Sequence, residues 1–275
     1  MNFSLPLRSF NPHFNGLQEL LNIAYKARNS VTFSFCSSVA SVSSRSNEDG
    51  TPIKEATFTS SDASPTGYGM SKWVGETICF TNAVNRETNQ QRHRKVKVKI
   101  LRLGQLTGDT VTGAWNRSEA WPRMLSTVDI LGCLPRLEDQ PLDWLPLDTA
   151  AKAVVETTFA EDDEDDGCKV YHIVQHKREK NWLDLLGWIK DTREKDFEVV
   201  ETKEWLERLK TCSEEHPAKA LLGLWKKAYG EEAEKSTASE FAVDEAKRVS
   251  PTMRDLEALS EEQGKMIWKW LNSKN

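Results

Sequence analysis

Apolar positions in the first part of the chain follow two spacings, one helical and one extended. Four of them recur on one helix face, which predicts an amphipathic helix over residues 14 to 29: Leu17, Leu20, Leu21 and Ala24. The run VTFSFCSS, residues 31 to 38, is β-branched and aromatic and ends in serines. It predicts a buried strand that delivers small hydroxyls at its carboxyl end. A polar loop over residues 43 to 65 and a second helix over residues 68 to 84 are expected next.

A second strand is expected in QRHRKVKVKILRLG. Three apolar residues alternate with lysines before two leucines and the turn at Gly104: Val96, Val98 and Ile100. This pattern indicates a strand that enters from a basic surface and becomes buried. The basic cluster at residues 92 to 99 could bind anions, but a solvated strand entrance is favoured because no aromatic residues lie between the charges.

The rest of the chain predicts more helix than strand. LDWLPLDTAAKAVVETTFA indicates a helix that is N-capped by Asp148 and ends near Phe159. The acidic run 161 to 167 is expected to be an exposed loop, with partner binding as the alternative, and a strand follows over residues 169 to 174. Helices are then expected in NWLDLLGWIK, TKEWLERLK, HPAKALLGLWKKAYG and EEQGKMIWKWLN.

Strands that alternate with helices, followed by a helical tail, predict an α/β fold in two parts. We expect a Rossmann-like domain with a parallel sheet over residues 1 to 175 and a smaller, mostly helical domain over residues 176 to 275. The segment 113 to 140 is expected to join the second domain.

Composition narrows the classes of protein. The 275 residues are 38% hydrophobic and 29% charged, and no apolar run is long enough to cross a membrane. MNFSLPLRSF lacks the basic and apolar regions of a signal peptide, so a cytoplasmic protein is expected. A net charge of −5 gives no pull toward nucleic acid, and five scattered cysteines without a CxxC pair argue against a disulfide framework or a metal site.

Candidate chemistry lies in TGYGMSKWVGE. Tyr68 and Lys72 are four residues apart on a predicted helix, so the ammonium can lie beside the phenol and lower its pKa toward neutrality. Ser38, at the end of the first strand, could donate to the same carbonyl oxygen as Tyr68. Taken alone, this spacing is more often an ordinary surface pair.

These segments together resemble a known family. The strand ending in two serines, followed by Y-G-x-S-K-W-V-x-E, resembles the active-site stretch of extended short-chain dehydrogenases, in the branch of the thioester reductase domains. Those domains end fungal nonribosomal-peptide-like synthetases, polyketide hybrids and aminoadipate reductase. LRLGQLTGDTVTGAWNRSEAWPRML and LDWLPLDTAAKAVVE are also similar to family segments, as are the C-terminal helices. The resemblance covers essentially the whole chain.

The resemblance implies roles for particular residues. The catalytic set would be Ser38, Tyr68 and Lys72. The residues expected to bind substrate follow the second strand: Gln105, Trp115, Trp121 and Met124. For the two tryptophans the alternative is core or interface packing, and for the glutamine it is orienting the loop.

One family feature is missing from this sequence. A dinucleotide site begins with a strand, a glycine-rich turn and a helix, and no glycine cluster here has that setting. The comparison therefore implies a truncated Rossmann-like sheet that lacks its first four strands.

The missing motif favours a cofactor-independent cyclisation or isomerisation catalyst as the main functional hypothesis. It would close a ring by a [4+2], aldol or Dieckmann-type reaction on a polyketide, terpenoid or peptide-derived substrate, with no cofactor. An NADPH-dependent thioester or aldehyde reductase is the alternative, and a non-catalytic remnant or scaffold partner is the second alternative.

A shortened sheet would also leave one edge unpaired. We expect a homo-oligomer interface, or the N-terminal segment Met1 to Asn11, to cover residues 31 to 35. The substrate pocket is expected at the carboxyl ends of the strands, between Ser38, Tyr68 and residues 115 to 124.

Overall fold

The computed structural model describes residues 5–45, 50–87, 96–161, 167–213, 215–230 and 239–273. The chain divides into two compact units, each made of three stretches of sequence. Unit 1 consists of Met1–Leu106, Thr149–His176 and Ser239–Leu256, and unit 2 of Thr107–Asp148, Lys177–Ala238 and Glu257–Asn275. Residues 1–4, 92–95 of the basic cluster and 162–166 of the acidic run lie outside the described residues. The division into domains at residue 175 stays a prediction.

Unit 1 is built on a parallel sheet of three strands in the order β1-β2-β6. The strands are β1 (Val31–Ser38), β2 (Val96–Leu103) and β6 (Cys168–Ile173). Val31 pairs with Val96 and Ser38 with Leu103, so β1 and β2 run in register over their whole length. The expected α/β class with a Rossmann-like parallel sheet is confirmed.

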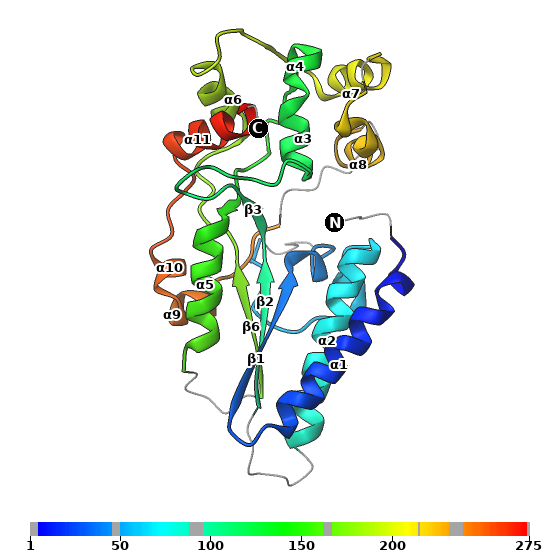
Figure 1. The fold of residues 1–275 in the computed structure, drawn as a ribbon, viewed down its shortest axis with the longest axis vertical. Helices are drawn as coiled ribbons and strands as arrows, with labels where there is room; N and C mark the ends of the chain where they lie inside the picture. The colour runs from blue at the N-terminus through cyan, green and yellow to red at the C-terminus, as the bar shows by residue number, and fades with distance from the viewer. Residues whose placement is uncertain are drawn as a thin grey trace. The chain divides into compact units, whose positions relative to one another are not determined.

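Helices cover both faces of this sheet (Figure 1). The helices of unit 1 are η1 (Leu7–Phe10), α1 (Asn11–Lys26), η2 (Val39–Ser41), η3 (Ser60–Asp62), α2 (Gly67–Glu87), α5 (Leu147–Phe159), α9 (Asp244–Val249) and α10 (Pro251–Arg254). α1 and α2 pack together on one face, and α5 lies on the other. The core between α1, α2 and the sheet is formed by Leu17, Leu21, Cys79, Ala83, Val98, Ile100 and Val170.

β1 is less buried than its sequence predicts. Ser37 is its one buried residue, and Val31, Phe33 and Phe35 are half-buried. The expectation of a buried strand is wrong because β1 is an edge strand that pairs with β2 alone within the described sheet.

The described part of the N-terminal segment does not run along the edge of β1. η1 packs against α1 and α2, and a Cβ atom on Gly67 would lie 2.0 Å from the carbonyl oxygen of Leu5. This segment therefore packs against the start of α2. The expectation that it covers the edge of β1 is wrong for residues 5–11. Coverage of the edge by self-association stays a prediction.

The basic character of β2 also differs from expectation at one position. Lys99 is 1% exposed, and its Nζ donates to the carbonyl oxygens of Thr157 at 2.8 Å and Ala160 at 2.7 Å. These carbonyls lie at the C-terminal end of α5, where a cation is favoured by the helix dipole. Lys99 is therefore a buried cap of α5 and not part of a solvated surface.

Unit 2 holds an aromatic core. Its elements are α3 (Ala120–Ser126), α4 (Val128–Leu131), β4 (Cys133–Pro135), β5 (Trp144–Pro146), α6 (Trp182–Lys190), β7 (Glu198–Val200), α7 (Thr202–Thr211), η4 (Pro217–Leu221), α8 (Leu222–Tyr229) and α11 (Glu261–Asn272). Nine of the ten tryptophans of the chain lie in this unit, and Trp144, Trp182 and Trp205 are fully buried. β3 (Gln105–Thr107) and α5 carry the chain from one unit to the other.

Most expected helices are found, with shifted ends. α1 ends at Lys26 and α2 begins at Gly67, one residue before the expected start. Asp148 lies inside the first turn of α5, and its carboxylate accepts a bond from the backbone N–H of Thr110 at 3.1 Å. The assignment of Asp148 as the N-cap is therefore wrong. Within the described ranges, no helix has the length and apolar character needed to cross a membrane.

Candidate active site

The expected catalytic residues come from the end of β1 and the start of α2. Ser38 is the last residue of β1, and Tyr68 and Lys72 lie one turn apart on α2. Gly69 lets the two elements meet, since a Cβ atom there would lie 2.8 Å from the carbonyl oxygen of Ala40 in η2. A larger residue at Gly69 would push α2 away from the segment that follows Ser38.

The Ser38 side chain acts on the phenol of Tyr68, because a hydrogen bond from its hydroxyl works to lower the pKa of Tyr68. Ser38 Oγ also accepts a bond from the backbone N–H of Ala40 at 3.2 Å, so the Ser38 hydroxyl proton is free to point at the phenol. Two hydroxyl groups therefore lie together at the carboxyl end of β1. This is the arrangement that can donate two hydrogen bonds to one carbonyl oxygen.

The phenol of Tyr68 does not have the pKa that the sequence suggested. Burial raises the pKa of Tyr68 above its usual value of 10, and the hydrogen bond from Ser38 opposes this only in part. Lys72 was expected to lower this pKa, but its Nζ lies over the Tyr68 ring, 5.7 Å from the centroid, and donates to the carbonyl oxygen of Cys36 at 2.8 Å. That expectation is wrong, and Tyr68 stays protonated through neutral pH.

Lys72 is shifted in the opposite direction. Burial lowers the pKa of Lys72 below 10.5, and electrostatic attraction to Cys36 and to Glu76 partly opposes this shift. An ammonium has three donors, and the bond to Cys36 uses one of them. The remaining N–H groups can serve the hydroxyls of a ligand.

Glu76 on α2 and Arg102 on β2 form a buried pair next to these residues. The sequence did not predict a role for either residue. Glu76 is 4% exposed and Arg102 is fully buried. Arg102 Nη2 lies 2.7 Å from Glu76 Oε2, and Arg102 Nε lies 3.0 Å from Glu76 Oε1. The one sequence signal was the spacing, because Glu76 follows Lys72 by the same four residues that separate Lys72 from Tyr68.

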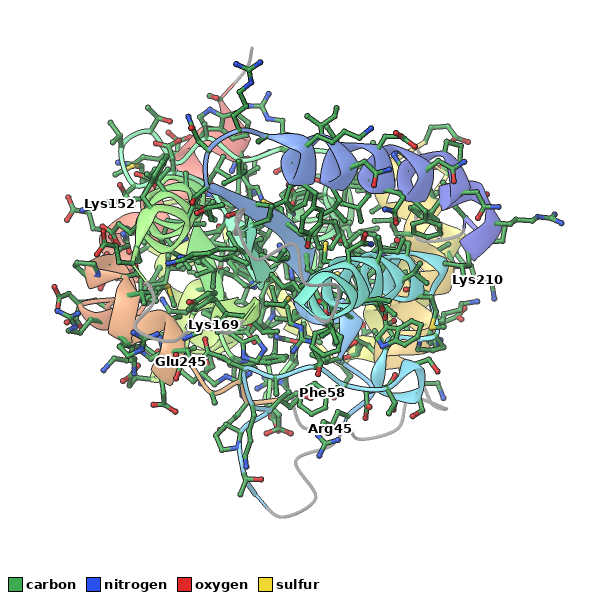
Figure 2. The ribbon with its side chains drawn as sticks, turned by 90° about the horizontal axis from the view of Figure 1, so that it is seen from below. Arg45, Phe58, Lys152, Lys169, Lys210 and Glu245 are labelled. Carbon is green, nitrogen blue, oxygen red and sulfur yellow. The ribbon has the colours of Figure 1, made fainter. Side chains whose placement is uncertain are left out.

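An aromatic ring lies over the buried pair. The Phe58 ring is 4.7 Å from the guanidinium carbon of Arg45 and 5.6 Å from that of Arg102. Figure 2 shows Arg45 beside the Phe58 ring. The indole N–H of Trp73 on α2 donates to the carbonyl oxygen of Phe58 at 3.0 Å, which holds this segment against the helix.

The four residues expected to bind substrate lie in two different units. Gln105 belongs to unit 1, and its Nε2 donates to the carbonyl oxygen of Leu106 at 2.7 Å. Trp115 and Met124 are buried in the core of unit 2, and Trp121 packs 5.1 Å from Trp144 between ring centroids. Contact of these four residues with a substrate stays a prediction.

Two findings bear on a dinucleotide cofactor. Tyr68 and Lys72 present hydroxyl and ammonium donors that fit the ribose and nicotinamide end of such a molecule. The fourteen glycines of this sequence contain neither a G-x-G-x-x-G nor a G-x-x-G-x-x-G spacing, so residues for the phosphate end are not among them. The residues present fit one half of the cofactor.

Comparison with known proteins defines the class to which this site belongs. The chain belongs to the NAD-binding family described as Male sterility protein, which matches residues 1–154. It is 29% identical over 270 residues to an adenylate-forming reductase of Stachybotrys bisbyi, covering 94% of this chain and 24% of that protein. It is 28% identical over 277 residues to a carboxylic acid reductase of Neurospora crassa, covering 95% and 25%. The chain thus spans about a quarter of the length of these relatives.

Solved structures share the fold. The terminal R domain from the myxalamid PKS-NRPS biosynthetic pathway superimposes with a TM-score of 0.77 at 21% identity, covering 98% of this chain and 66% of that one. The PhqB reductase domain from Penicillium fellutanum gives a TM-score of 0.61 at 12% identity, covering 94% and 63%. The expected membership of the thioester reductase branch of the extended short-chain dehydrogenases is confirmed.

These findings correct two expectations. The hypothesis of a cofactor-independent cyclisation or isomerisation catalyst is wrong, because the family is NAD-binding and the relatives are named reductases. The expectation of no cofactor is wrong for the same reason. It rested on the missing glycine motif, although the chain matches an NAD-binding family over residues 1–154.

Proposed function

We propose that this chain supplies the carbonyl-activating residues of an NADPH-dependent reductase. Its substrate would be an acyl thioester, or the aldehyde derived from it, in polyketide or peptide-type biosynthesis. The observation that carries the proposal is the meeting of Ser38 at the end of β1 with Tyr68 and Lys72 at the start of α2, where Lys72 Nζ lies 5.7 Å from the centroid of the Tyr68 ring. The names of the relatives, which are reductases of adenylate-forming and carboxylic-acid type, support the reaction class.

The two hydroxyls would act on the carbonyl oxygen. Ser38 and Tyr68 would each donate a hydrogen bond to it, and these bonds strengthen as negative charge develops on the oxygen. Because burial raises the pKa of Tyr68, the phenol carries its proton at neutral pH and can pass it to that oxygen. When bound, NADPH supplies a hydride, so that a thioester, NADPH and one proton give an aldehyde, a thiol and NADP⁺.

Lys72 would hold the cofactor and not the substrate. Its bond to the carbonyl oxygen of Cys36 fixes the ammonium at the end of β1. The remaining donors would bind the ribose hydroxyls of the nicotinamide half, as the fit of the side chain suggests.

The test is to mix the intact protein with an acyl thioester and NADPH, and to measure the rate of reduction from the loss of NADPH absorbance. Tyr68→Phe should lower kcat by about 10²- to 10⁴-fold, which is the usual contribution of a general acid. Tyr25→Phe is the matched control, because Tyr25 lies near the C-terminal end of α1 and packs against a core cluster that contains none of the candidate site residues, and it should keep the parent kcat. Parent-like turnover by the Tyr68 variant would exclude proton transfer from this residue.

A further inference from the structure

A buried carboxylate ties the two halves of the candidate site together. Glu76 lies on α2, the helix that carries Tyr68 and Lys72, and its carboxylate forms a two-point ion pair with Arg102 on β2. Charge pairs with so little exposure are retained only where every polar atom finds a partner. Here the carboxylate of Glu76 accepts hydrogen bonds from other side chains besides the guanidinium of Arg102.

The additional donors are the serines on either side of Ser38. Ser37 Oγ lies 2.5 Å from Glu76 Oε1, and Ser41 Oγ lies 2.6 Å from the same oxygen. Ser41 Oγ is also 2.8 Å from the carbonyl oxygen of Ser38, so its single proton is shared between the two acceptors. Both serines are buried. The backbone at Ser38 is therefore held from both sides by one carboxylate.

Arg102 is held in turn by a neutral histidine. Burial and the nearby charge of Arg102 lower the pKa of His172 to about 3, so its ring is uncharged at neutral pH. His172 Nδ1 donates to the carbonyl oxygen of Ala242 at 2.8 Å, which leaves Nε2 to accept from Arg102 Nη1 at 3.3 Å. The guanidinium thus has a fixed orientation, and so has the carboxylate that it binds.

We propose that Glu76 is a positioning residue that sets the separation of the Ser38 and Tyr68 hydroxyls. Glu76 and Tyr68 lie on the same helix, α2, so their positions are fixed relative to each other. Through its hydrogen bonds to Ser37 and Ser41, Glu76 then fixes the position of Ser38 relative to Tyr68. An ionised carboxylate suits this role, since it only accepts hydrogen bonds and can take two serines and two guanidinium N–H groups at once. For its kinetic readout this inference rests on the proposed reductase function.

The experiment leaves the ion pair in place. Removing Glu76 would strand the buried charge of Arg102 and unfold the protein, so the double variant S37A/S41A is used in the intact protein instead. Ser34→Ala is the matched control, because Ser34 lies on the same strand but bonds to Thr158 Oγ1 at 3.0 Å. If the double variant folds poorly, Ser37→Ala alone should give a smaller change in the same direction.

Two readouts separate positioning from stability. The kcat for thioester reduction should fall about 10- to 100-fold while the KM for NADPH is unchanged, since small misplacements of reacting groups have effects of this size. The pKa of Tyr68 should rise, because the Ser38 hydrogen bond that lowers it is weakened. Tyrosinate absorbance gives this pKa by difference from the same protein with Tyr68→Phe. Ser34→Ala should change neither quantity.

The outcomes distinguish this inference from the proposed function. A parent protein that reduces no thioester with NADPH would overturn the proposed function, and the Tyr68 titration, which needs no substrate, would then decide the positioning role. Parent values of kcat and of the Tyr68 pKa in S37A/S41A would show that Glu76 only stabilises the fold.

Discussion

Lys72 is the residue through which the cofactor proposal can be tested by binding alone. Its half-buried ammonium loses part of its hydration, and this burial lowers the pKa of Lys72. Its bond to the carbonyl oxygen of Cys36 leaves other N–H donors for a ligand. If this half-buried ammonium binds ribose hydroxyls, the hydrogen bonds it makes are charge-assisted and offset the lost hydration.

We predict that Lys72→Met weakens NADPH binding by the intact protein about 10- to 100-fold, the loss expected for one or two hydrogen bonds to a charged group. Isothermal titration measures the dissociation constant. Lys152→Met, at an exposed position on α5, is the control and should bind NADPH like the parent. Equal affinity in the parent and the Lys72 variant would remove this residue from the cofactor site.

Glu55 is a half-buried acid that predicts a pH effect on stability. Its carboxylate accepts from the backbone N–H groups of His172 at 2.8 Å, Glu245 at 2.6 Å and Ala246 at 3.0 Å. Burial nevertheless raises the pKa of Glu55 to about 7, because desolvation outweighs these bonds.

The raised pKa means that the folded protein binds a proton at Glu55 that the unfolded chain releases near pH 4.5. The stability from this group is therefore full below about pH 4.5 and is lost as pH rises through about 7. We predict that the free energy of unfolding of Glu55→Gln, measured in urea, falls less over this range than that of the parent. A parallel pH dependence in the two proteins would contradict the assignment.

At the scale of elements, β2 shows how one strand can anchor a helix. Lys99 reaches across to the last carbonyls of α5, whereas Lys97 on the same strand is half-buried. The ammonium replaces the hydrogen bonds that the end of α5 would otherwise make with water.

We predict that Lys99→Met lowers the free energy of unfolding by about 2 to 3 kcal/mol, since it strands buried carbonyls and removes charged hydrogen bonds. Lys97→Met should change it by less than about 0.5 kcal/mol, as expected for a substitution away from such bonds. Urea unfolding of both variants measures the difference. Equal losses would indicate that Lys99 does not cap α5.

Local patterns predicted the elements but not their partners. The bounds of β1, β2 and α11 agree with the sequence because apolar spacing and capping residues act over a few positions. The Glu76–Arg102 pair joins residues 26 positions apart, and the pairing follows from packing that neither segment specifies alone. The burial of Lys99 could not be predicted for the same reason, because it depends on contacts with the distant helix α5.

At the scale of the whole molecule, the candidate catalytic residues could be predicted because a family resemblance links three segments. Ser38, Tyr68 and Lys72 all lie in unit 1, as alternation of strands and helices suggested. The return of residues 239–256 to that unit was not foreseen, because the contact of Glu55 with α9 spans 190 positions. The prediction of no cofactor was wrong because it took the missing glycine motif as evidence that no dinucleotide binds, whereas the chain matches an NAD-binding family.

The central claim is that these residues assist hydride transfer to a carbonyl carbon. The most direct test is to incubate the intact protein with an acyl thioester and NADPH deuterated at C4, and to analyse the product by mass spectrometry and NMR. We expect deuterium at the former carbonyl carbon, and NADP⁺ in an amount equal to that of the aldehyde formed. Product that forms without NADPH, or that carries no deuterium when each face of C4 is labelled in turn, would contradict it.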